Sequence, residues 1–195
     1  MFKDTLGQLR WFKFRHTEAA RVAARHESGH ALVASVLGYP FDEVYIQDYK
    51  RHRGLGGGVV PTPRLEAEGD VAALCRAILV DIAVHVTGVL GEYNWETISL
   101  AAYRLGQQND LHVACGLMRA FAMIRPDLPD IGNEIFNAAW SDMTSAQWRT
   151  AIGKGYKLLL LSGGSRVPSE SFKKIAQEHS LDLPLVRETI TRIGV

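Results

Sequence analysis

The sequence predicts a mainly α protein, an array of helices with one small β-ribbon of two or three strands. Apolar residues recur at helical spacing before residue 38 and over most of the chain after residue 64. The alternation typical of a strand is confined to the stretch between residues 41 and 60. The 195 residues provide room for one domain, or for one domain and an arm, and leave no room for a second module of ~100–200 residues.

Charge and cysteine content exclude several classes of protein. The 22 basic and 21 acidic residues give a formal net charge of +1, and the basic residues are scattered rather than gathered on one face. An electrostatic grip on nucleic acid is therefore not expected. The two cysteines, Cys75 and Cys115, lie in apolar helical stretches and form neither a disulfide pattern nor a metal-binding pair. Because the start of the chain also lacks a secretory signal, we expect a cytoplasmic protein with reduced thiols.

Residues 1–16 read as an amphipathic arm ahead of the domain formed by residues 17–195. The arm mixes Leu, Phe and Trp with Lys and Arg, and we expect it to pack against the domain. Binding to a membrane surface or to a partner is the alternative for this segment.

The first predicted helix and the β-ribbon follow in order. Thr17 is a good N-cap, and Gly38 followed by Pro40 ends the helix. The segment FDEVYIQDY (41–49) alternates like a strand, and after the turn KRHRG the run LGGGVV (55–60) reads as a second extended piece.

The remainder is helical by periodicity. The stretch from Val71 to Gly91 is the most hydrophobic, but it carries Arg76, Asp81 and His85, which are costly at a bilayer centre, so we expect a core helix and no integral membrane segment. The run Gly163-Gly164-Ser165 reads as a helix stop. The predicted helices span, in order, Leu65–Tyr93, Asn109–Arg125, Ile131–Asp142, Ser145–Leu161, Ser169–His179 and Leu185–Ile193.

Residues 26–30 match the pattern His-Glu-x-x-His inside the first predicted helix. His26 and His30 stand one turn apart on one face, so both imidazoles can reach a single zinc ion. Glu27 would lie beside the metal without binding it, which suits a base that takes a proton from water and passes it to the leaving amine. A pair of ordinary polar or core histidines is the alternative, but the apolar run that follows at 31–34 would bury the helix beneath a site.

A catalytic zinc ion needs a third protein ligand. Val33 and Val36 occupy the positions where a metzincin carries its Gly and third His, so that class is excluded. Glu92 or Glu96 would give a thermolysin-like site. Asp110 is the best candidate, although its predicted place at the start of a helix also suits a capping residue without a metal. None of the other histidines has a ligand-spaced partner, and we expect surface or core roles for His16, His52, His85, His112 and His179.

Three segments resemble the FtsH-type membrane metalloprotease family. HESGHALVA at 26–34 resembles the family's HEAGHALVA, with Ser28 in place of Ala. GVLGE at 88–92 is similar to a Gly-x-x-Ala-Glu helix, with Gly91 in place of Ala and without the usual second Glu. QNDLHVA at 108–114 resembles the Ser-Asn-Asp-Leu-x-x-Ala segment that holds the family's third zinc ligand. Order and spacing agree over residues 17–125.

The resemblance implies a largely helical peptidase domain with a small β-ribbon. It implies zinc held by His26, His30 and Asp110, with Glu27 as the general base and Glu92 either supporting a ligand or packing in the core.

The resemblance also implies that the substrate lies extended beside an edge strand near the metal. The counterpart here is the run Gly56, Gly57 and Gly58, which would recognise the substrate backbone, and a flexible turn is the alternative for these glycines. The family's transmembrane segments and ATPase module are not expected in this chain, so its ATP dependence is not carried over.

We therefore expect a zinc-dependent metalloendopeptidase that hydrolyses unfolded or extended polypeptides and is not itself ATP-driven. A non-catalytic, zinc-stabilised peptide-binding or regulatory domain is the alternative, followed by a metal-free helical interaction domain. Glu27 favours the enzyme, because a structural zinc site needs no base and usually has four protein ligands. The expected partner is a peptide or unfolded protein substrate, and both a separate delivery partner and a homo-oligomer are compatible with the sequence.

Overall fold

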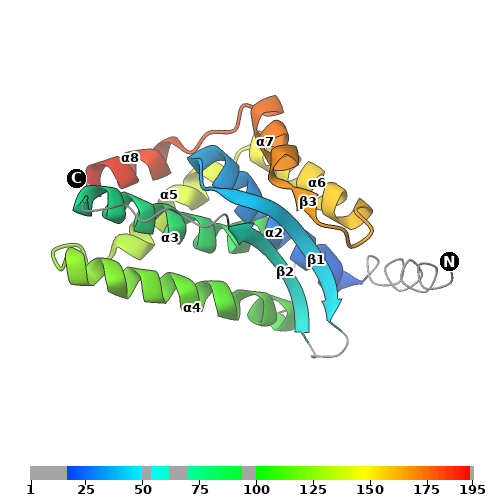
Figure 1. Cartoon of the computed structure of the whole chain (residues 1–195), viewed down its shortest axis with the longest axis horizontal. Helices are drawn as coiled ribbons and strands as arrows, with labels where there is room; N and C mark the ends of the chain where they lie inside the picture. The colour runs from blue at the N-terminus through cyan, green and yellow to red at the C-terminus, as the bar shows by residue number, and fades with distance from the viewer. Residues whose placement is uncertain (1–16, 50–53, 62–69, 94–99, 194–195) are drawn as a thin grey trace.

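A computed structural model describes residues 17–49, 54–61, 70–93 and 100–193, and within these ranges the mainly α architecture predicted from the sequence is confirmed (Figure 1). The predicted arm at 1–16, the turn at 50–53 and Glu96 lie outside the described residues. The helices are α2 (Glu18–Leu37), α3 (Val71–Tyr93), α4 (Leu100–Ile124), α5 (Ile131–Met143), α6 (Ala146–Leu161), α7 (Ser169–Glu178) and α8 (Pro184–Ile193), and the strands are β1 (Phe41–Tyr49), β2 (Gly54–Pro61) and β3 (Val167–Pro168).

Helix α2 is the centre of the fold and has the predicted ends. Thr17 Oγ1 accepts a hydrogen bond of 3.2 Å from the amide of Ala20, and Gly38 ends the helix in the left-handed conformation with φ 70°. Every residue from 24 to 34 is buried, because α2 packs against α3, α6, α7 and the β1–β2 hairpin. A helix covered on all sides has no solvated face for its polar residues. The His-Glu-x-x-His residues must therefore find partners inside the protein.

The three strands form an antiparallel sheet in the order β2-β1-β3. An irregularity between Phe41 and Glu43 adds a residue to β1, so Phe41 and Val44 are both buried although they are three residues apart. The position of β3 was not predicted from the sequence, because a strand of two residues is too short to show an alternating pattern. It pairs with Glu43 and Val44.

Helix α3 passes through the core, as the sequence predicts. Among the described residues it is the one helix long and apolar enough to cross a membrane by length and composition, and 61% of that apolar window is buried inside the structure. Leu79, Ile82 and Leu90 are at most 1% exposed. The helix begins at Val71, after Asp70, so the part of the predicted helix from Leu65 to residue 69 lies outside the described residues.

Helix α4 begins well before the predicted start at Asn109. It extends from Leu100 to Ile124, which places Asp110 near the middle of the helix. The segment LAAYRL is rich in strong helix formers and continues the helix through the polar residues that resembled an N-terminus. The capping interpretation of Asp110 is therefore wrong, since amides in the middle of a helix already have helical acceptors.

The remaining helices begin and end within a residue of their predicted bounds, from α5 to α8. The glycine pair after α6 has φ values of 69° and 83° at Gly163 and Gly164, which confirms the predicted helix stop.

The start of α8 depends on a side chain from another helix. Asp142, near the end of α5, accepts amide hydrogen bonds from Leu185 at 3.3 Å and from Val186 at 3.1 Å. We expect Asp142→Ala to lower the free energy of unfolding by about 1 kcal/mol. Asp142→Asn should lose only part of this stability, because its one amide oxygen can still accept one of the two hydrogen bonds. Urea denaturation measures both. The control is Ser141→Ala at the neighbouring exposed position, and an equal effect there would contradict the capping role.

Candidate metal centre

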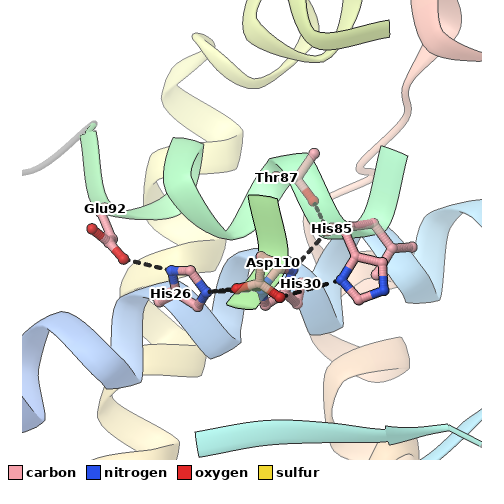
Figure 2. A network of polar contacts seen from close by, with 7 residues as sticks. His26, His30, His85, Thr87, Glu92 and Asp110 are labelled. Carbon is pink, nitrogen blue, oxygen red and sulfur yellow. Dashed lines mark hydrogen bonds and ion pairs between the residues drawn. The ribbon is translucent and has the colours of Figure 1, made fainter. Parts of the chain in front are cut away.

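The structure brings His26 and His30 of α2 together with Asp110 of α4 (Figure 2). The Nε2 atoms of the two histidines are 2.9 Å apart. Oδ2 of Asp110 lies 2.7 Å from Nε2 of His26 and 3.3 Å from Nε2 of His30. These donor atoms all lie within 4.8 Å of one another, and the group can hold a metal ion.

The outer nitrogens of both imidazoles are engaged by acceptors. Nδ1 of His26 is 2.5 Å from Oε1 of Glu92, and Nδ1 of His30 donates to the carbonyl of Val84 at 2.6 Å. A proton on each Nδ1 leaves the lone pair of a neutral imidazole on Nε2. Two lone pairs and a carboxylate oxygen then face one another, so the centre requires a cation or a proton between them.

The carboxylates around His26 favour the protonated form of its imidazole. Burial acts to lower the pKa of His26, but its hydrogen bonds to Asp110 and Glu92 outweigh burial and raise the pKa to about 10. Burial acts to raise the pKa of Asp110, and its bonds to His26, His30 and His85 instead hold that pKa far below its usual range. A divalent cation bound here would displace the proton, as ligand deprotonation requires.

Glu27 is buried beside the histidines, with an exposed fraction of 7%. Its Oε2 atom has no hydrogen-bond partner. Burial raises the pKa of Glu27, and the charges of His26 and His30 partly offset this rise. A buried carboxylate oxygen without a partner is costly, which points to a ligand or reactant at this position.

Glu92 contacts His26 at the nitrogen that faces away from Asp110. It is fully buried. Among the described residues, the group that can hold a metal consists of His26, His30 and Asp110. Glu92 is not part of this group. The arrangement agrees with the supporting position that the resemblance implies, and does not place Glu92 as the third ligand.

Comparisons with protein-family models, curated proteins and solved structures find no match for this chain. The FtsH-type resemblance therefore stays a hypothesis carried by the three motifs.

Helices α2 and α3 approach closely because glycines line their contact. A Cβ added to Gly88 would lie 2.5 Å from Cε1 of His30 and 2.7 Å from Nε2 of His26. A Cβ added to Gly91 would lie 2.8 Å from the carbonyl oxygen of Arg25. The departure from the family pattern at Gly91 thus has a structural reason, since this crossing leaves no room for Ala.

The other departure from the family pattern, Ser28, also has a packing explanation. Its hydroxyl donates to the carbonyl of Ala24 at 2.6 Å and is fully buried. It lies against α6, where a Cβ on Gly155 would come within 2.9 Å of Ser28 Oγ. Ser28 therefore satisfies its hydroxyl within α2.

His85 is the site residue that the sequence analysis missed. A surface or core role was expected, yet its Nδ1 lies 3.2 Å from Oδ1 of Asp110. The spacing of His85, Gly88 and Glu92 as i, i+3 and i+7 places them on one face of α3, and this pattern was the available signal. His112, in contrast, is exposed, as expected.

The glycine run lies in a strand, so the flexible-turn alternative is wrong. Gly56, Gly57 and Gly58 belong to β2 and pair with Gln47, Ile46 and Tyr45 of β1. Among the described strands only β1 pairs with β2, which is thus an edge strand. It contacts α2 and α4, the helices that carry His26, His30 and Asp110, and Figure 2 shows a strand passing below these residues.

Proposed function

We propose that the protein is a zinc-dependent metalloendopeptidase that hydrolyses peptide bonds of unfolded or extended polypeptides without unfolding them by ATP hydrolysis. The observation that carries the proposal is the convergence of His26, His30 and Asp110 next to the buried, unpartnered oxygen of Glu27. The His-Glu-x-x-His motif and the FtsH-type resemblance support it from the sequence.

The donor set fits a catalytic zinc ion. Two imidazole nitrogens and one carboxylate oxygen are typical zinc ligands, and three protein ligands leave a fourth position for water. Zinc bound there would polarise the scissile carbonyl and lower the pKa of water towards ~7.

Residues of the chain transfer the proton and hold the imidazoles in place. Glu27 takes the proton of the attacking water, holds it in a buried position and passes it to the leaving amine. Glu92 and the carbonyl of Val84 keep the two imidazoles aimed at one point through their Nδ1 atoms. A transition state would thus meet a site that needs little reorganisation.

The sheet edge suggests the class of substrate. An extended polypeptide can add to β2 as a further strand, and the glycines of β2 would leave its backbone accessible for pairing. Both ligand histidines are only 5% exposed, so a folded protein surface could not reach them. An unfolded segment is narrow enough to reach the histidines, whether a delivery partner presents it or the protein encounters it freely.

The alternative is a non-catalytic, zinc-stabilised peptide-binding or regulatory domain. Burial of the ligands favours it, since structural metal sites are closed. Glu27 and the three-ligand set favour the enzyme.

Metal removal separates the two functions. We expect the purified chain to cleave a fluorescently labelled, reduced and alkylated protein in the absence of ATP. Cleavage should stop on treatment with a zinc chelator and return with added zinc. A zinc-loaded chain that cleaves nothing would favour the binding domain, and full cleavage after zinc removal would contradict the metallopeptidase.

Zinc should also stabilise the fold, because its ligands come from two helices. At a free zinc concentration 100 times the dissociation constant, we expect the free energy of unfolding to rise by about 2.7 kcal/mol. Urea denaturation with zinc and with chelator measures this difference, and Asp110→Asn provides the control that should lose most of it. An unchanged midpoint in the wild type would favour the metal-free interaction domain.

A further inference from the structure

His85 occupies a position on α3 directly beside the metal ligands. Its Nδ1 lies 3.2 Å from Oδ1 of Asp110, and its ring centroid is 6.2 Å from that of His30, with the ring planes 71° apart. The side chain of His85 is 28% exposed and that of Asp110 is 20% exposed. The side chain of His85 is therefore more exposed than those of the largely buried group that it adjoins, and Figure 2 shows it next to Asp110.

The two oxygens of Asp110 have different partners. Oδ2 faces the Nε2 atoms of His26 and His30, whereas Oδ1 is within hydrogen-bond distance of His85. A carboxylate with both oxygens free can bind a metal through both of them, and the second oxygen would then take the coordination position that a catalytic water needs.

Asp110 lies on a different helix from the two histidines, so a separate contact is needed to fix its carboxylate. His26 and His30 share α2, and each is held by an acceptor at Nδ1. Asp110 comes from a separate helix, α4, which packs mainly against α3, the helix that carries His85. A hydrogen bond between α3 and α4 is therefore placed to fix the carboxylate.

We propose that His85 is a positioning residue that holds Oδ1 of Asp110, so that this aspartate binds the metal through one oxygen and one coordination position stays open. The proposal rests on the proposed metal centre and not on peptide hydrolysis. His85 is not itself one of the three grouped ligands found among the described residues.

Zinc affinity tests the proposal without any substrate. Competition with a chromophoric chelator gives the dissociation constant for the wild type, His85→Leu, His85→Asn and His112→Leu. We expect His85→Leu to bind zinc about 10–100-fold more weakly, as is typical when a ligand loses its hydrogen-bond partner. His85→Asn should recover most of this loss, because its amide nitrogen lies near the place of Nδ1. His112→Leu removes an exposed imidazole from α4 and should bind zinc like the wild type.

Cobalt substitution reports the coordination directly. The visible absorption of the Co²⁺-loaded protein depends on its coordination geometry. We expect the spectrum of His85→Leu to weaken as the second oxygen of Asp110 enters the coordination sphere, and that of His85→Asn to match the wild type. Circular dichroism in the presence of chelator checks that the variants fold, and His85→Ala replaces His85→Leu if the latter does not.

If His85→Leu, or His85→Ala in its place, binds zinc like the wild type and has an unchanged cobalt spectrum, the proposal is overturned. A His85→Asn variant no better than His85→Leu would overturn it too. A wild type that cleaves no peptide, while His85→Leu still loses zinc affinity, would refute the peptidase and leave the role of His85 standing.

Discussion

Replacing Glu27 with glutamine is expected to remove cleavage of an unfolded protein while zinc binding and the fold persist. Glutamine has the shape of glutamate but cannot accept the proton of the attacking water. The substitution should lower turnover by about 10²–10⁴-fold, the usual contribution of a general base. Because Oε2 of Glu27 has no hydrogen-bond partner, the amide displaces no existing bond at that atom. Cleavage rate, zinc content and thermal melting of the same preparation measure the three quantities.

Glu92→Gln is the matched control for Glu27→Gln. Glu92 is also a buried glutamate with an unpartnered Oε2, but its other oxygen contacts Nδ1 of His26. Its substitution should weaken zinc binding, and activity should return at higher zinc concentration. Activity lost by Glu27→Gln should not return with zinc. Unchanged turnover in Glu27→Gln would exclude Glu27 as the base, and loss of zinc together with activity would make it a support of the metal centre.

The part of the site that the sequence could predict is the part that depends on one helix. The caps at Thr17 and Gly38 and the spacing of His26 and His30 are local, and a helix turn alone sets the two imidazoles side by side. The hairpin also followed from local alternation, and β1 and β2 have the predicted positions.

The parts that could not be predicted depend on how helices pack. Asp110 was the best candidate for the third ligand, with a capping role as the alternative, and the true start of α4 excludes only the cap. His85 gave no signal on its own, because its partner is on another helix. Contacts between distant segments are set by the packing of whole helices, which periodicity does not encode.

Gly88 offers the sharpest test of that packing. A methyl group at this position would meet Nε2 and Cε1 of His30 and Nε2 of His26, so it would enter the space where the metal ligands converge. Neither imidazole can move away easily, since each is held at Nδ1 by Glu92 or by the carbonyl of Val84. Overpacking of this kind costs about 1–3 kcal/mol. If this energy is spent on moving the two imidazoles out of their metal-binding positions, Gly88→Ala should bind zinc about 5–150-fold more weakly.

Gly116→Ala makes the same chemical change on α4, where an added Cβ has no neighbour within 4 Å. Removing a glycine from a helix interior should stabilise it by about 0.5–1 kcal/mol. The two substitutions should therefore act in opposite directions, with zinc affinity lost only at Gly88. Chelator competition and urea denaturation of both variants measure this contrast. Wild-type zinc affinity in Gly88→Ala would show that α3 does not press on the histidine pair, and the close crossing of α2 and α3 would then have no part in shaping the metal centre.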